Sequence, residues 1–169
     1  MKLSPTYKLQ FKRREEGKTD YQRRLKLLKS GKPRLVVRKS LNYITAQIVE
    51  FTTKGDKTII SATSKELKKL GWNFAADNLP AAYLTGMIIA KKCKEKNISE
   101  VILDIGLYAS TKGNRIYAVV KGAVDGGLKI PVSEEILPSE DRISGKHITY
   151  LEKFKSLPET FESVKSKLM

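Results

Sequence analysis

The sequence predicts an α/β domain with one mixed β-sheet, a basic N-terminal arm and a C-terminal helix. Between residues 34 and 63, short apolar or alternating segments are separated by turn residues, which is typical of a three-strand antiparallel meander. From residue 78 onward, segments with helical and extended patterns alternate, as in layered α/β domains. Lys and Arg are concentrated in the first forty residues, ahead of most of these patterns.

The chain divides into three predicted parts. We predict a basic N-terminal arm and helix over residues 1–33, an α/β globular domain over residues 34–150, and a C-terminal helical extension over residues 151–169. Residues 1–18 are polar and basic and have no core-facing apolar stripe, so we interpret them as an arm. The total of 169 residues suits one domain with such additions.

A short helix is predicted over residues 20–29. Thr19 begins a sequence with the spacing of a capping box, so we expect its hydroxyl to cap the first turn. Tyr21, Leu25 and Leu28 fall on one narrow face of this helix. We expect that face to pack on the domain, with the intervening cations facing outward.

Three antiparallel strands are expected at about residues 35–37, 44–49 and 58–60. The first is a compact apolar run, and the second alternates apolar and polar residues with the period of a half-buried strand. Turn residues at 40–42 and 54–56 separate the three segments. A meander of consecutive hairpins follows from this order.

Helices and strands alternate in the second half of the chain. A helix is predicted over residues 78–97, because Asn78 suits an N-cap, and Gly86 within it suits close packing. Residues 101–103 are apolar, as is typical of a strand covered on both faces. Residues 115–124 have helical spacing, and residues 129–131 are expected to be extended.

The charge distribution indicates a polyanionic partner. The net charge is +15, whereas a charge of about 2 to 8 keeps a small domain soluble. Residues 1–40 hold fourteen Lys and Arg against three acids, and residues 41–169 hold nineteen against fifteen. A solvated basic face is the alternative interpretation of the arm, but solubility alone does not require this asymmetry.

The sequence favours a cytoplasmic protein. Cys93 is the only cysteine, which excludes an internal disulfide and suggests a reducing compartment. The first residues lack the apolar segment of a secretory signal, and the apolar run at residues 83–90 is too short to span a bilayer. The helix at 20–29 has too narrow an apolar face to bind a membrane surface, so we predict no membrane partner.

Few residues in this sequence suit catalysis. His147 is the only histidine and Cys93 has no second cysteine near it, so we predict no metal and no cofactor. A metal-dependent nuclease is the enzyme alternative, because a sheet beginning with a meander is reminiscent of ribonuclease-H-like folds and Asp104 ends a predicted strand. Only Glu50 lies on the first three strands as a companion, so we interpret Asp104 as a capping or salt-bridging residue and the chain as no enzyme.

The basic arm has the composition of an RNA-binding segment. Arginine neutralises phosphate and its planar guanidinium stacks on bases. Aromatic rings stack on unpaired bases, at about 1–3 kcal/mol per base. The first forty residues combine six arginines with three aromatic residues, namely Arg13, Arg14, Arg23, Arg24, Arg34, Arg38, Tyr7, Phe11 and Tyr21. For Tyr21, a place in the core is an equal alternative.

Several sequence blocks resemble one known family. The run "FKRREEGKTDYQRRLKLLKSGKPRLVVRKS" followed by "AQ", and then "GWN", "LPAAYLTGMIIA", "LDIGL", "KGAVDGGLKIP" and "SGKHI", occur in that family's order and spacing. The chain resembles the archaeal and eukaryotic branch of the ribosomal protein family numbered eighteen in the large subunit. The match extends from Tyr7 to the C-terminal helix.

This resemblance implies that the basic segment and the start of the first strand contact 5S rRNA. The implied contacts, with the arm residues beside them, are Tyr7, Lys8, Phe11, Lys12, Arg13, Arg14, Lys18, Thr19, Tyr21, Arg23, Arg24, Arg34, Arg38, Lys39 and Ser40. Further candidates near matching blocks are Trp72, Asn73, Arg142 and His147. The family's first turn carries a polar residue where this chain has Leu41, so Asn42 is expected to serve instead.

The resemblance also implies a fold and a cellular place. The fold would be of ribonuclease-H-like topology without nuclease activity. The expected function is that of a structural constituent of the large ribosomal subunit, which binds 5S rRNA and attaches it to the central protuberance. The implied partners are 5S rRNA, large-subunit rRNA and neighbouring ribosomal proteins including the family-five protein, in cytoplasmic ribosomes.

Overall fold

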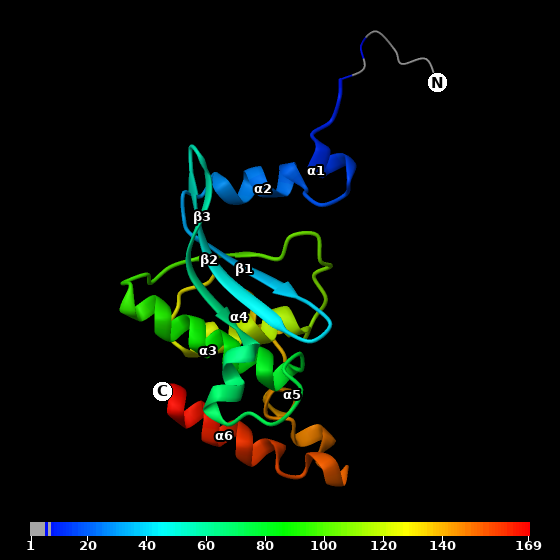
Figure 1. Ribbon diagram of the computed structural model, residues 1–169, viewed down its shortest axis with the longest axis vertical. Helices are drawn as coiled ribbons and strands as arrows, with labels where there is room; N and C mark the ends of the chain where they lie inside the picture. The colour runs from blue at the N-terminus through cyan, green and yellow to red at the C-terminus, as the bar shows by residue number, and fades with distance from the viewer. Residues whose placement is uncertain (1–5, 7) are drawn as a thin grey trace.

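The computed structural model describes residue 6 and residues 8–169, and it contains a four-stranded mixed sheet with helices against one face (Figure 1). The strands are β1 (Arg34–Lys39), β2 (Ile44–Thr52), β3 (Gly55–Thr63) and β4 (Ile102–Asp104). Their order in the sheet is β3-β2-β1-β4. β1, β2 and β3 pair antiparallel, and β4 pairs parallel with β1. The predicted antiparallel meander is confirmed.

Two short helices precede the strands, two helical segments lie between β3 and β4, and the remaining helical segments follow β4. They are α1 (Lys12–Glu15), α2 (Tyr21–Leu28), η1 (Ser64–Leu70), α3 (Leu79–Glu95), α4 (Arg115–Asp125), η2 (Glu134–Ile136), α5 (Glu140–Ser144), η3 (Lys146–Ile148), η4 (Glu152–Phe154) and α6 (Leu157–Leu168), where η denotes a 3-10 helix. Asn78 caps α3 by accepting a hydrogen bond from the Ala81 N–H at 2.9 Å. The predicted helices at 20–29, 78–97 and 115–124 therefore exist, with bounds shifted by a few residues.

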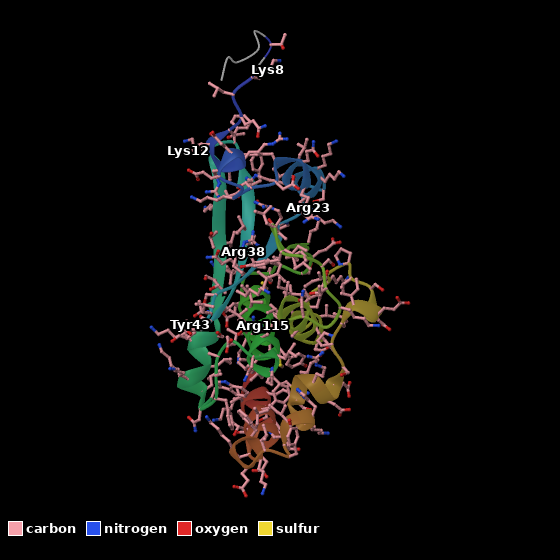
Figure 2. All side chains as sticks on the ribbon, turned by 90° about the vertical axis from the view of Figure 1, so that its right-hand side faces the viewer. Lys8, Lys12, Arg23, Arg38, Tyr43 and Arg115 are labelled. Carbon is pink, nitrogen blue, oxygen red and sulfur yellow. The ribbon has the colours of Figure 1, made fainter. Side chains whose placement is uncertain are left out.

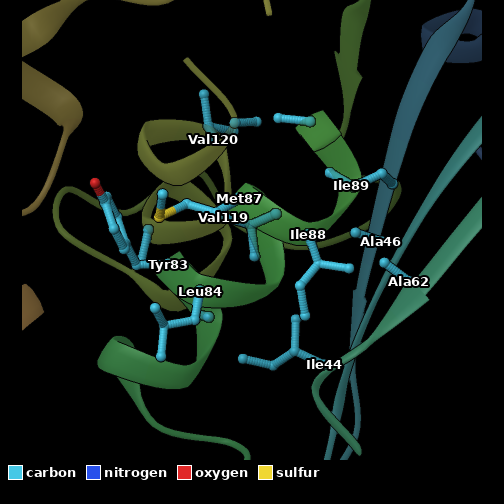
Figure 3. Close-up of a cluster of buried hydrophobic side chains, with 14 of the residues drawn as sticks. Ile44, Ala46, Ala62, Tyr83, Leu84, Met87, Ile88, Ile89, Val119 and Val120 are labelled. Atoms are coloured by element: carbon cyan, nitrogen blue, oxygen red, sulfur yellow. The ribbon is translucent and has the colours of Figure 1, made fainter. Parts of the chain in front are cut away.

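The core lies between the sheet and the helix pair α3 and α4. Ile44, Ala46 and Ala62 project from β2 and β3 towards Ile88 and Ile89 of α3, and all five are buried (Figure 3). α3 and α4 cross closely because glycine lies at the contact, as was expected for Gly86. A Cβ atom at Gly86 would lie 2.1 Å from the Val119 carbonyl oxygen.

The prediction of an extended strand at residues 129–131 is wrong. The structure has only an isolated parallel bridge between Glu100 and Lys129 there. Pro131 has no N–H to donate, which removes a ladder hydrogen bond at the point where the strand would lengthen. The strand predicted at 101–103 exists as β4, but it is the edge of the sheet and its Ile102 and Leu103 are only half-buried.

The turn and terminal predictions differ in outcome. The first turn is at 40–43, where the Ser40 N–H donates to the Tyr43 carbonyl oxygen at 2.8 Å. β3 already begins at Gly55, so the second turn is shorter than expected. The C-terminal helix exists as α6 and buries Phe161 and Val164. Among the described residues, no helix is long and apolar enough to cross a membrane.

Candidate nucleic-acid interface

A groove of about 590 Å³ lies between α2 and the sheet face opposite to α3 and α4. Its floor includes Val36 and Gln47, which alternate along β1 and β2 with residues of the core. The wall opposite the sheet comes from the N-terminal segment and α2, where Figure 2 shows Lys12 and Arg23. The charged lining consists of seven cations and three acids, namely Arg13, Lys18, Arg23, Arg24, Lys26, Arg34, Arg38, Asp20, Asp56 and Asp104.

The N-cap of α2 is Asp20, so the prediction that Thr19 caps this helix is wrong. The Asp20 carboxylate accepts hydrogen bonds from the N–H groups of Gln22 and Arg23, both at 3.0 Å. The backbone hydrogen bond from Arg23 is the main cause that lowers the pKa of Asp20. A carboxylate satisfies these orphan N–H groups and also the positive end of the helix dipole. Thr19 instead accepts a hydrogen bond from Arg13 Nε at 2.9 Å, which holds α1 against the start of α2.

Helix α2 is held to the sheet by an ion pair rather than by the predicted apolar stripe. Leu25 is 57% exposed, so the expected packing of Tyr21, Leu25 and Leu28 as one buried face is wrong. Arg24, which was expected to face outward, donates from both Nη atoms to the Asp56 carboxylate at 2.7 Å. The hydrogen bond from Arg24 lowers the pKa of Asp56, and the same bond raises the pKa of Arg24.

The ion pair continues into the sheet through Arg34. Its side chain is buried, and Nη2 lies 2.8 Å from Asp56 Oδ2 while Nη1 donates to Asp104 Oδ2 at 2.8 Å. Neither Nε nor Nη2 of Arg34 has a partner with hydrogen-bond geometry within the described part of the chain, so the contact of Nη2 with Asp56 is an ion pair without a directed hydrogen bond. A chain of charges thus joins Arg24 on α2 to Asp56 on β3, Arg34 on β1 and Asp104 on β4.

Arg38 completes this chain at the loop after β4. Nη1 donates to the Asp104 carbonyl oxygen at 2.9 Å, and Nη2 lies 3.4 Å from Asp104 Oδ1. Gly106 gives this guanidinium room, because a Cβ atom there would lie 2.9 Å from Arg38 Nη2. Arg23 of α2 reaches the same loop and donates to the Gly106 carbonyl oxygen at 3.3 Å. Asp104 therefore acts as a salt-bridging residue, as the sequence predicted.

The cations of the N-terminal segment, α2 and β1 divide into two groups. Arg24, Arg34 and Arg38 are engaged with carboxylates or backbone carbonyls of the domain. The exposed group contains Lys8, Lys12, Arg13, Arg14, Lys18, Arg23, Lys26 and Lys29. Within that group, Lys18 forms an exposed ion pair with Glu16 at 2.8 Å, and Arg13 and Arg23 each donate a hydrogen bond within the protein while their side chains stay exposed. The exposed group is the one that an anionic partner can reach.

Two aromatic rings lie beside these exposed cations. The Phe11 and Tyr21 rings are 5.1 Å apart between centroids, with an interplanar angle of 45°. Phe11 is 72% exposed, whereas Tyr21 is half-buried rather than part of the core. Tyr7, the third predicted aromatic contact, lies outside the described residues.

The candidates at the first turn lie at the other end of β1. The Lys39 ammonium lies over the Tyr108 ring, 5.1 Å from its centroid. The Ser40 hydroxyl accepts the Tyr43 N–H at 3.0 Å and so shapes the turn. Leu41 is 92% exposed and Asn42 is exposed beside it.

The downstream candidates are not brought to the groove. Trp72 is only 2% exposed and its Nε1–H donates to the Ala75 carbonyl oxygen at 3.0 Å, so it is a core residue rather than a surface contact. Asn73 beside it is exposed. Arg142 and His147 are exposed on α5 and η3, and in Figure 1 α5 lies at the opposite end of the molecule from α2. Three separate places therefore hold the predicted contacts.

Asp56 is the functional residue that the sequence reasoning missed. The sequence predicts a turn at its position, and its partners Arg24 and Arg34 are 32 and 22 positions away in the numbering. No local pattern links an acid in one hairpin to arginines on a distant helix and strand. The only signal was the presence of an acid within a strongly basic half of the chain.

Comparison with known proteins gives a consistent result over most of the chain. A family model described as "Ribosomal large subunit proteins 60S L5, and 50S L18" matches residues 5–100 and 94–133. The large ribosomal subunit protein uL18 of Korarchaeum cryptofilum (strain OPF8) is 55% identical over 148 residues, which cover 88% of this chain and 76% of that protein. The resemblance found in the sequence is thereby confirmed. The chain belongs to the family of ribosomal large subunit proteins that includes 60S L5 and 50S L18.

Proposed function

We propose that the protein is a structural constituent of the large ribosomal subunit that binds 5S rRNA and attaches it to the central protuberance. Its family membership supports a ribosomal role. The observation that carries the RNA-binding part is the groove under α2, rimmed by exposed cations and by the paired rings of Phe11 and Tyr21. Cations neutralise phosphate, and an exposed ring offers a surface on which a base stacks.

The acids in the groove do not oppose this function. The Asp20 carboxylate accepts backbone N–H groups, while Asp56 and Asp104 are paired with arginines. Arginines therefore balance the charges of Asp56 and Asp104, and the Asp20 carboxylate is engaged by the first turn of α2, so the exposed cations dominate the potential that RNA meets.

We propose two roles for the predicted contact residues. Lys12, Arg13, Arg14, Lys18 and Arg23 contact phosphate, because their side chains are exposed. Arg24, Arg34 and Arg38 hold the α2 wall and the sheet floor of the groove in place, because their guanidinium groups are already occupied. Lys39, Ser40 and Asn42 extend the contact beyond β1, while Asn73, Arg142 and His147 do not line the groove.

The remaining parts of the proposal follow from family membership and topology. The proposed further partners are large-subunit rRNA and the family-five ribosomal protein, in cytoplasmic ribosomes. The sheet order β3-β2-β1-β4, with β4 parallel to β1, supports a ribonuclease-H-like topology. The protein has no proposed enzymatic role, since both oxygens of Asp104 accept hydrogen bonds from the protein itself.

A salt titration tests the proposed interface. The triple variant Lys12→Gln, Arg14→Gln and Lys26→Gln removes three exposed cations whose side chains have no hydrogen bond in the described structure. The slope of log affinity for 5S rRNA against log salt should fall by about 2–3, at roughly 0.7–0.9 per phosphate contact. The matched control replaces exposed Lys112, Lys129 and Lys146 with Gln and should leave the slope almost unchanged. Equal slopes for both variants would refute this interface.

A further inference from the structure

A second cationic surface surrounds the end of β3 and the η1 segment that follows it. Three lysines of other helices converge on this segment. Lys92 Nζ donates to the Ser61 carbonyl oxygen at 2.9 Å and Lys96 Nζ to the Ile59 carbonyl oxygen at 3.1 Å. Lys167 Nζ donates to the Leu70 carbonyl oxygen at 3.0 Å.

The segment itself adds three exposed lysines. We define the lysine edge as Lys65, Lys68, Lys69, Lys92, Lys96 and Lys167. Glu66 is the only acid in residues 59–70. Burial would raise the pKa of Glu66, but its contacts with Lys92 at 2.7 Å and with the Thr63 N–H outweigh burial and lower it. Glu66 thus pairs with Lys92, and the other five lysines of the edge form no ion pair among the described residues.

The lysine edge and the groove under α2 are separate surfaces. β3 begins at Gly55 beside α2 and ends at Thr63 where η1 starts (Figure 1). Thr58 is the groove-lining residue of β3 nearest to η1, and at about 3.3 Å per residue it is about 16 Å from Thr63 along the strand. This distance exceeds the Debye length of about 8 Å at physiological salt. Lys96 reaches β3 at Ile59, beside Thr58, whereas the η1 lysines Lys65, Lys68 and Lys69 lie beyond Thr63 and therefore attract anions independently of the groove.

The composition of the lysine edge indicates what it binds. It has no arginine, and residues 59–70 contain no aromatic residue, whereas the groove has five arginines and two rings beside it. Lysine acts as a mobile point charge for phosphate and lacks the planar fork that stacks on bases or binds in a bidentate manner. The edge is suited to a phosphate backbone, without reading its sequence.

We propose that the lysine edge binds the phosphate backbone of a second RNA segment while the groove holds the first. This inference rests on the proposed function, because it takes RNA as the partner of the groove. Lys92 and Lys96 also cover outward carbonyl groups of β3, which is the edge strand of the sheet. Lys65, Lys68 and Lys69 make no such contact in the described structure, so protection of the strand edge does not account for them.

The test uses the full-length protein, 5S rRNA and a mixed-sequence RNA duplex of about 20 base pairs as the second probe. We expect protein saturated with 5S rRNA to bind the duplex still. In the variant Lys65→Gln, Lys68→Gln and Lys69→Gln, the salt slope for the duplex should fall by about 2–3, at roughly 0.9 per contact. Its affinity for 5S rRNA and its melting temperature should stay unchanged.

The control variant Lys112→Gln, Lys129→Gln and Lys146→Gln loses the same charge elsewhere. An equal loss of duplex binding in both variants would show that net charge alone attracts the duplex and would overturn the inference. So would displacement of the duplex by 5S rRNA, or tighter binding of poly-glutamate than of duplex at equal charge concentration. Failure of the wild-type protein to bind 5S rRNA would instead refute the proposed function, while duplex binding would still report on the lysine edge.

Discussion

Removing the carboxylate of Asp56 should weaken both the fold and the binding of RNA. Asp56 holds Arg24 by two hydrogen bonds of 2.7 Å and lies 2.8 Å from Nη2 of the buried Arg34. The Arg24 pair is about 30% exposed, so it contributes about 1 kcal/mol, the upper end for surface pairs. Arg34 keeps Asp104 as a partner, so the loss there is below the usual ~3–5 kcal/mol of a broken buried pair, about 1–3 kcal/mol.

The variant Asp56→Ala should therefore lose about 2–4 kcal/mol of unfolding free energy in a urea titration. Arg24→Met should lose about 1 kcal/mol, because Arg34 keeps both carboxylates in that variant. The pKa of Asp56 is lowered in the folded state, so its stabilisation is fully present above its unfolded pKa near 3.8 and is lost as pH falls through the folded value. The stability difference should be constant from neutral pH to about pH 4 and shrink below it.

The same variant gives an RNA result that charge alone does not predict. Removing an acid from a cationic groove should strengthen RNA binding if electrostatics alone acted. Without the Asp56 carboxylate, however, Arg24 no longer holds α2 over the groove. If ordering α2 on binding then costs about 1 kcal/mol, the affinity for 5S rRNA should be about fivefold weaker. Asp56→Glu should restore part of that affinity. If Asp56→Ala bound 5S rRNA more tightly and unfolded at the wild-type urea concentration, the tether would have no role.

Two further outcomes concern the core. Gly122→Ala places a Cβ atom 2.0 Å from the Tyr83 carbonyl oxygen, so the contact between α3 and α4 must open. The unfolding free energy of this variant should fall by about 1–3 kcal/mol. The control variant Gly31→Ala, at the open turn after α2, should lose less unfolding free energy. Trp72, the only tryptophan, is 2% exposed and packs against Phe74, so its fluorescence should be that of a buried indole and should not change when 5S rRNA binds. A large change on RNA addition would contradict its assignment to the core.

The sequence predicts those parts of the fold that depend on neighbouring residues. The alternation in β2, the N-cap at Asn78 and the glycine at 86 are local signals, and the structure contains each feature they indicate. The prediction of a strand at residues 129–131 is wrong because an extended segment forms a strand only where another strand offers a free edge for pairing. Glu100, just before β4, offers that edge for one bridge with Lys129, before Pro131 interrupts the donors.

The candidate site was harder to predict because arginine serves two purposes with the same side chain. Composition places Arg24 and Arg34 in the same class as Arg14, since all three lie in one basic segment. Their roles separate only when the fold brings Asp56 between two of them. Helix periodicity predicts that the apolar stripe of Tyr21, Leu25 and Leu28 packs on the domain. Periodicity takes no account of the charged residues on the surface that the helix contacts, and here that surface presents Asp56.

The ion chain also explains why acids persist in a surface that we propose binds RNA. A buried guanidinium such as that of Arg34 cannot be hydrated, so it needs carboxylates within the fold. Asp56 on β3 and Asp104 on β4 supply these carboxylates. The Oδ1 atom of Asp56 also accepts a hydrogen bond from a second arginine, Arg24. The acid thereby links a helix outside the sheet to its centre, and the exposed cations on that helix gain a fixed position over the groove. Rigid placement lowers the entropy lost on binding, so carboxylates that contact no phosphate still favour RNA affinity.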